Sequence, residues 1–67
     1  MNGLELYELR KKHDVTQSEL AQHLGYLTKG IPNRSMICRF ENGHANINKR
    51  IEIAIKQYFK LVEVINE

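Results

Sequence analysis

Residues 15–25, which read VTQSELAQHLG, are the stretch that decides the fold of this chain. Thr16 and Glu19 have the spacing of a capping box, in which the side chain of each residue bonds to the backbone amide of the other. An apolar face follows directly, and Gly25 is a typical C-terminal stop. The stretch therefore predicts a short helix over residues 17–24 with a sharp start and a sharp end.

Similar local signals on either side predict three further helices. One covers Leu4–Lys12, with basic residues in its last turn, where cations suit the helix dipole. Another begins near Asn33, a good N-cap residue, and buries Ile37 and Phe40. Tyr26–Pro32, which lies between the helix over residues 17–24 and the one that begins near Asn33, is expected to form a loop.

The last predicted helix runs from about residue 46 or 48 to the C-terminus, and would be roughly 30 Å long. Ile53, Phe59 and Val64 fall outside its main apolar stripe. Three short helices offer too little core to cover so much apolar surface, so we expect a partner on the distal part. The stripe itself recurs at every third or fourth position and consists of Ile47, Ile51, Ala54, Ile55, Tyr58, Leu61, Val62 and Ile65.

The length of 67 residues allows one small domain, whose core supplies no more than about 3–5 kcal/mol of net stability. A single cysteine, Cys38, excludes an internal disulfide, so an oligomer is the expected support for the fold. Apolar runs are too short to span a membrane, and the N-terminal stretch lacks the order of a signal peptide. A free thiol without an export signal predicts a cytoplasmic protein.

The net charge of +2 is unevenly distributed along the chain. Residues 1–27 and residues 51–67 each carry a net charge of −1, whereas residues 28–50 carry +4. A basic middle segment between faintly acidic ends indicates a local patch for an anionic partner.

Two helices joined by a turn, the second short and basic, indicate a helix-turn-helix. Two segments make this specific: Thr-Gln-Ser-Glu-Leu-Ala at residues 16–21 and Ile-Cys-Arg-Phe-Glu-Asn-Gly at residues 37–43. Together with Leu9-Arg10 and Leu24-Gly25, they resemble the Cro/phage-repressor (XRE-like) helix-turn-helix family over roughly residues 4–58. The resemblance implies an all-α, lambda-repressor-like bundle of four to five helices with a long C-terminal helix, in a single domain of residues 1–67.

The chain departs from the family in the turn between the second and third helices. Gly25 and Glu41 have 15 residues between them, several more than in the family. A turn of this length therefore does not by itself fix the angle that the family has between its second and third helices. The enlarged loop also carries Lys29, which we expect to reach the DNA backbone.

The resemblance implies that the third helix enters the major groove of DNA and that the second begins at a phosphate. Arginine bonds in a bidentate manner to guanine, and a helix N-terminus binds phosphate. The expected base contacts are Arg34, Ser35, Met36 and Arg39. The expected backbone contacts are Gln17, Lys29, Asn33, Asn42, Gly43 and His44, with Asn46 and Lys49 as weaker candidates.

The remaining residues of note have structural roles in this interpretation. Arg10 and Glu41 resemble the ion pair of the family that joins the first helix to the end of the third. Cys38 is expected to be a small filler residue. The three histidines have no ligand spacing with one another or with Cys38, so neither a metal nor a cofactor is expected. The expected dimer interface consists of Tyr58, Leu61, Val62 and Ile65.

The resemblance thus implies a sequence-specific DNA-binding transcriptional regulator, a repressor of a phage, plasmid or other mobile element, that acts as a homodimer on a palindromic operator. Double-stranded DNA and a protein antirepressor are the expected partners, and a membrane is not. The alternatives are a restriction–modification controller, an antitoxin, or a protein-interaction module without DNA binding. An enzyme is not expected, because no catalytic triad, carboxylate pair or phosphate-binding glycine loop is present in the sequence.

Overall fold

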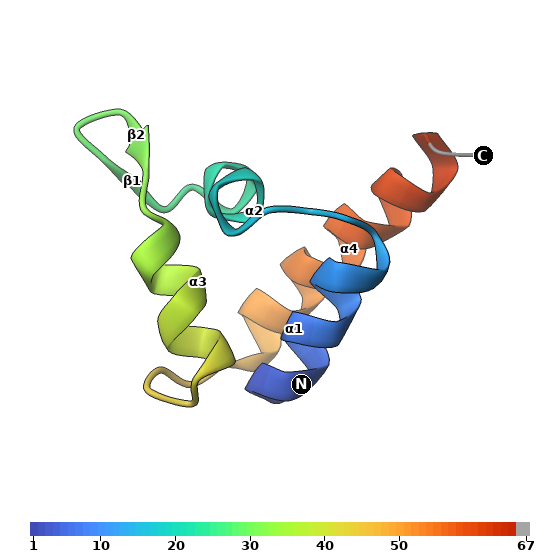
Figure 1. Cartoon of the computed structure of the whole chain (residues 1–67), viewed down its shortest axis with the longest axis horizontal. Coiled ribbons are helices and arrows are strands. Elements are labelled where there is room, and N and C mark those ends of the chain that lie inside the picture. The colour runs from blue at the N-terminus through green and yellow to red at the C-terminus, as the bar shows by residue number, and fades with distance from the viewer. Residues whose placement is uncertain (66–67) are drawn as a thin grey trace.

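The computed structural model describes residues 1–65 and contains four helices and one small hairpin in that range (Figure 1). The all-α fold class and the long C-terminal helix are as predicted. None of the described helices is long and apolar enough to cross a membrane. The elements are α1 (Gly3–Lys12), α2 (Gln17–Leu24), β1 (Leu27–Thr28), β2 (Ile31–Pro32), α3 (Arg34–Glu41) and α4 (Lys49–Ile65).

Side-chain oxygens cap three of the four helix starts. The predicted capping box at α2 is confirmed: the amide of Glu19 donates to the hydroxyl of Thr16 over 3.1 Å, and the amide of Thr16 donates to the Glu19 carboxylate over 3.3 Å. Asn2 and Asn48 each accept an amide hydrogen bond at the starts of α1 and α4, over 2.8 and 2.9 Å. Asn33 precedes α3, but its side chain makes no capping bond.

The helices end in turns that return their last carbonyl groups to backbone amides. At α3, the amide of His44 donates to the carbonyl of Arg39 over 2.8 Å, and that of Gly43 donates to Phe40 over 3.3 Å. Gly43 has a φ of +78°, which this turn requires. Asp14 has the same role after α1 with a φ of +56°, a conformation that aspartate adopts more readily than most residues.

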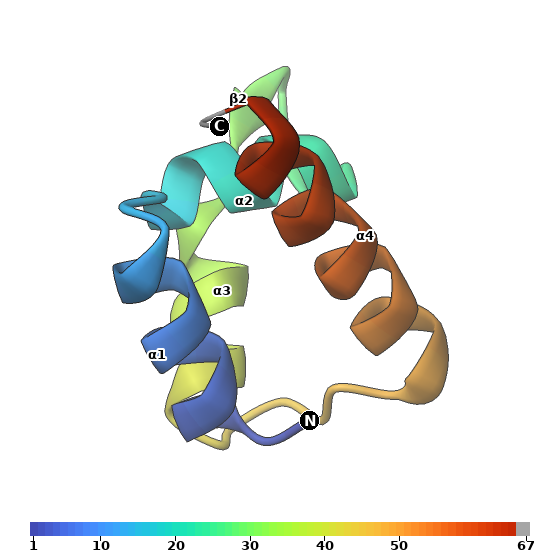
Figure 2. The ribbon, with the colours of Figure 1, turned by 90° about the vertical axis from the view of Figure 1, so that its right-hand side faces the viewer.

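One hydrophobic core lies where the four helices meet. In Figure 2, α1 and α3 form one side of the molecule, α4 forms the other, and α2 crosses above them. Phe40 in α3 and Ile55 in α4 are almost fully buried, so the core joins the helix-turn-helix half of the chain to the C-terminal helix. The buried apolar residues are Leu6, Val15, Leu20, Ala21, Ile37, Phe40, Ile47, Ile55 and Phe59.

Helix α4 is turned differently from the sequence prediction. Phe59, expected outside the main stripe, is buried, whereas Leu61, expected on the stripe, is 55% exposed. Tyr58 and Val62 are partly buried and pack against the core, and the side chain of Ile65 lies outside the described part of the chain. The expectation that the core is too small to cover this stripe is therefore wrong for most of its described residues. The buried face of α4 includes Phe59 in place of Leu61.

The predicted loop of residues 26–32 is a β-hairpin. Leu27 pairs with Pro32 and Thr28 with Ile31 in an antiparallel ladder. The amide of Asn33 donates to the carbonyl of Tyr26 over 2.7 Å and closes the base of the hairpin. Two-residue strands are too short to show an alternating pattern in the sequence, which is why the hairpin was not predicted.

Candidate nucleic-acid interface

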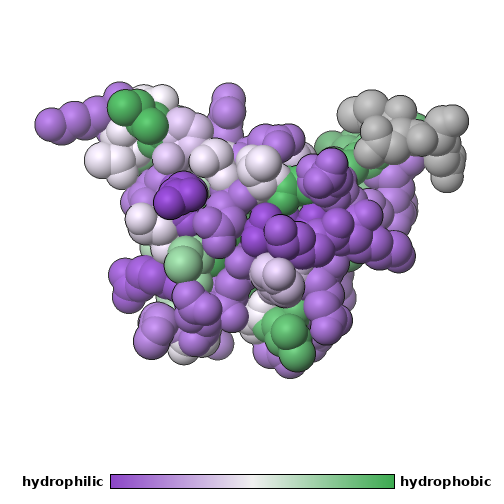
Figure 3. Space-filling model, in the orientation of Figure 1, coloured by the Kyte–Doolittle hydropathy of each residue, from purple (hydrophilic) through white to green (hydrophobic). Residues whose placement is uncertain are grey.

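Helix α3 has one buried side and one exposed polar side. Ile37 and Phe40 are buried in the core, as predicted. Arg34, Ser35 and Arg39 are exposed together on the outer side. Hydrophilic (purple) atoms cover most of the surface around α3 in Figure 3. The first turn of a helix with such a face presents its polar groups to any macromolecule that approaches from outside.

Two residues of α3 differ from their predicted positions. Met36, an expected base contact, is partly buried and packs against the core. Cys38, expected to be a small filler residue, is exposed on the outer face, and its sulfur accepts a hydrogen bond from the side-chain amide of Asn42 over 3.2 Å. Both differences follow from how the helix is rotated, because Ile37 and Phe40 turn position 38 outward and position 36 inward.

The outer side of α3 is cationic because the acid at the end of the helix is neutralised by an ion pair. Residues 27–40 include Lys29, Arg34 and Arg39 and no acidic residue. Glu41 follows, and the predicted ion pair with Arg10 is present. Arg10 Nε lies 2.7 Å from Glu41 Oε2, and Arg10 Nη2 donates to Glu41 Oε1 over 3.2 Å. Their side chains are only 9% and 7% exposed, so the carboxylate adds little negative charge to the outer surface.

Gln17 contributes to the same cluster. Its side-chain amide donates to Glu41 Oε1 over 3.2 Å, so the side chain that was expected to bind phosphate is partly engaged within the molecule. One amide hydrogen of Gln17 Nε2 is not used in that bond. The backbone N–H groups of Gln17 and Ser18, in the first turn of α2, have no acceptor within the helix.

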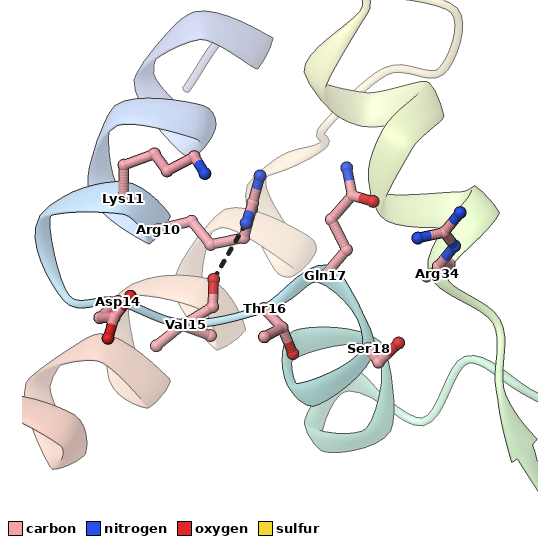
Figure 4. Close-up of a pocket in the computed structure, with 8 residues that line it drawn as sticks. All are labelled: Arg10, Lys11, Asp14, Val15, Thr16, Gln17, Ser18 and Arg34. Atoms are coloured by element: carbon pink, nitrogen blue, oxygen red, sulfur yellow. Dashed lines mark hydrogen bonds between the residues drawn. The ribbon is translucent and has the colours of Figure 1, made fainter.

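A hollow of about 360 Å³ lies at the start of α2 (Figure 4). Residues at the end of α1, the first turn of α2 and Arg34 from α3 line it. Lys11 also lines this hollow. Its place in the last turn of α1 explained it from the sequence as a cation that suits the helix dipole, so it was not predicted as a site residue. Asp14 is the one acid among the lining residues. The hollow therefore combines a helix N-terminus with three cationic residues, Arg10, Lys11 and Arg34, of which Arg10 is paired with Glu41.

The loop after α3 offers fewer donors than expected. The amides of Asn42, Gly43 and His44 all bond to carbonyls of α3. Gly43 has no side chain, so the predicted backbone contact at this position has no free donor. The side chains of Asn42 and His44 are exposed beside the outer face.

The other expected backbone contacts lie apart from this loop. Asn33 is half-buried at the start of α3, and Lys29 is exposed at the tip of the hairpin. The weaker candidates Asn46 and Lys49 are exposed near the start of α4. Within residues 1–65, no cluster of three or more histidine, cysteine or acidic side chains has an arrangement that would hold a metal ion.

The structure thus brings Arg34 to the start of α2 and leaves Ser35 and Arg39 exposed on the same helix, whereas Met36 is partly buried and the Gly43 amide is bonded within the chain. Comparison of the chain with protein-family models, with curated proteins and with solved structures found no match.

Proposed function

We propose that this protein binds double-stranded DNA in a sequence-specific manner and regulates transcription through helix α3. The observation that carries the proposal is the acid-free outer face of α3 beside the hollow at the start of α2. A protein that recognises a duplex needs one element that reads bases and another that binds phosphate at a fixed position. The outer face of α3 supplies the base-reading element, and the hollow at the start of α2 supplies the phosphate-binding element.

Helix α3 has the size and the side chains of a base-reading element. Its eight residues extend for roughly 12 Å, and a helix fits the major groove, which is about 12 Å wide. Arg34 and Arg39 bond to guanine through two parallel hydrogen bonds, and the Ser35 hydroxyl accepts or donates at any base edge. Cys38 and Asn42 lie on the same exposed surface and complete the contact area.

The start of α2 is the phosphate-binding element in this proposal. The free amides of Gln17 and Ser18 and the positive end of the helix dipole attract an anion. Lys11 adds a full positive charge on the other side of the hollow (Figure 4). A phosphate held here fixes the position of α3 along the duplex.

A homodimer on a palindromic operator is the proposed assembly. The described residues span 32 × 26 × 20 Å, dimensions that allow two adjacent copies to place equivalent helices in successive major grooves, roughly 34 Å apart. Ile53, Leu61 and Val64 are exposed on the outer side of α4 and offer an apolar contact surface. Repression, in a phage, plasmid or other mobile element, is the part of the proposal that is supported by the resemblance of the sequence to the Cro/phage-repressor family.

Selection of bound duplexes from a random oligonucleotide pool tests this function. We expect a two-fold symmetric consensus, and an affinity for it that falls steeply with salt as phosphate contacts release counterions. The double variant Arg34→Ala/Arg39→Ala loses the selected sequence. The control variant Arg50→Ala/Lys60→Ala removes the same charge from exposed positions on α4 and retains it. Failure to recover any consensus, or equal effects of the two variants, would contradict the proposal.

Cys38 provides a second, independent measurement. It is the only cysteine of the chain and is exposed on α3, so a thiol-alkylating reagent modifies one site. We expect the selected duplex to slow this alkylation, and a scrambled duplex of equal length to slow it much less. Equal rates in the presence and absence of the selected duplex would mean that α3 does not face the DNA.

A further inference from the structure

The β-hairpin projects from the helices beside the start of α3 (Figure 1). Lys29 and Gly30 form its two-residue turn, with φ values of +53° and +79°. Two consecutive positive φ values define a type I′ turn, which favours asparagine or glycine at its first position. The hairpin therefore holds a lysine at its tip, where the local backbone would favour a smaller residue.

One face of the hairpin and the first turn of α3 enclose a shallow hollow of about 480 Å³. Thr28 and Ile31 are partners across the ladder, so their side chains lie on the same face, and both line this hollow. Ile31 is 68% exposed. Leu27 is exposed too but does not line the hollow, although its ladder partner Pro32 does.

The lining of the hollow combines positive charge with apolar surface. Lys29 and Arg34 both line it, and no acid occurs between residues 27 and 40. Hydrophobic (green) atoms gather over the hairpin in Figure 3. The backbone of a DNA strand offers groups that match this lining, because negatively charged phosphates alternate with apolar deoxyribose rings.

We propose that this hollow holds the sugar–phosphate backbone of a DNA strand that flanks the base pairs read by α3. Lys29 binds a phosphate, and Ile31 packs against the adjacent deoxyribose. The inference rests on the proposed function and adds a contact that α2 and α3 do not provide. Because Arg34 and Ser35 line the hollow and also belong to the outer face of α3, the two contact surfaces are continuous.

The substitution Lys29→Asn separates a role in binding from a role in folding. Asparagine suits the turn, so we expect the urea midpoint of unfolding to stay the same or rise. Affinity for the duplex recovered by the selection falls about tenfold, as expected when a charged hydrogen bond is lost. The slope of log affinity against log salt falls in magnitude by about 0.9, the value for one phosphate. The control Lys60→Asn removes an exposed charge from α4 and changes neither quantity.

Ile31→Ala and Leu27→Ala test the orientation of the hairpin. We expect Ile31→Ala to weaken binding with an unchanged salt slope, because no charge is removed, and Leu27→Ala to bind as the unmodified protein does. If Lys29→Asn and Ile31→Ala both bind normally while Arg34→Ala/Arg39→Ala does not, the hairpin inference is wrong and the proposed function stands. If the unmodified protein selects no duplex, the proposed function itself is wrong, and the hairpin inference fails with it.

Discussion

Arg10 joins three parts of the chain through a single guanidinium group. It belongs to α1, donates to the carbonyl of Val15 in the following turn over 3.0 Å, and makes two bonds to Glu41 at the end of α3. Gln17 adds a further bond to the same carboxylate. The end of α3 is therefore held by α1 and α2 directly, so the enlarged turn between α2 and α3 does not leave the angle between them undefined.

We expect Arg10→Ala to lower the free energy of unfolding by about 3–5 kcal/mol, because it leaves the buried Glu41 carboxylate without its partner. This is as large as the whole stability expected of so small a domain, so the variant unfolds near room temperature. The double variant Arg10→Met/Glu41→Leu removes both charges and recovers part of the loss. Urea titration followed by circular dichroism measures all three proteins, and an unchanged midpoint for Arg10→Ala would contradict the role given to the pair.

Tyr58 gives the fold a dependence on alkaline pH. Burial and, secondarily, the Glu19 carboxylate raise the pKa of this phenol above its ordinary value of 10.0. Because folding raises the pKa, the neutral phenol contributes stability that is complete below pH about 10 and is lost as the pH rises through the pKa of the folded state. The urea midpoint of the natural chain should therefore fall above pH 10 more than that of Tyr58→Phe. Parallel declines of the two proteins would show that the phenol is not involved.

At the scale of elements, the proposed function gives α2 and α3 different tasks although they pack together. Arg34 and Arg39 extend from α3 toward base edges in the proposed complex, whereas Lys11 and the first amides of α2 surround a hollow that fits a phosphate. A base contact discriminates among sequences, and a phosphate contact does not. The hairpin between the two helices adds a third contact element to the same side of the molecule.

Substitutions in the two helices should therefore have different effects on binding. Arg39→Ala is expected to relax the preference at one base pair by about 1–3 kcal/mol. Lys11→Ala is expected to weaken all duplexes alike and to lower the salt slope by about 0.9. Affinities for the selected duplex and its single-base variants, measured at several salt concentrations, distinguish the two. If Lys11→Ala changes sequence preference and Arg39→Ala does not, the two tasks are assigned the wrong way round.

At the scale of the whole molecule, apolar surface remains after the core is complete. Ile53, Leu61 and Val64 are 47%, 55% and 64% exposed on the side of α4 away from the core. Tyr58 and Val62, expected in a dimer interface, pack on the core of their own chain instead. Among the residues whose side chains the structure describes, a dimer that uses α4 therefore relies on Leu61 of the predicted set, together with Ile53 and Val64, which the prediction left out.

We expect the protein to sediment as a dimer at micromolar concentration, and Leu61→Glu/Val64→Glu to sediment as a monomer. In a two-fold symmetric contact each introduced charge meets its own copy, so the repulsion is doubled. Leu4→Glu introduces a charge at an exposed apolar position on α1 and serves as the control. A natural chain that remains monomeric, both alone and on the selected duplex, would exclude this assembly.

The local hydrogen-bonding signals were sufficient to predict where most elements begin and end. The capping box at Thr16 and the stop at Gly25 depend on residues within one or two turns of each other. The ion pair of Arg10 with Glu41 was predicted from the resemblance to the Cro/phage-repressor family, because no spacing rule relates residues so far apart in the sequence. The capping box and the glycine stop could be predicted because the residues that form each of them lie close together in the sequence.

The tertiary structure alone decided how each helix is rotated and what meets across the chain. Phe59 replaced Leu61 in the core, and Cys38 came to the surface, because burial depends on the shape of the opposing helices. Gly3 shows the same dependence: a Cβ atom there would overlap the carbonyl oxygens of Phe40 and Glu41. Periodicity identifies the apolar residues of a helix, but only packing against the other helices selects which of them are covered.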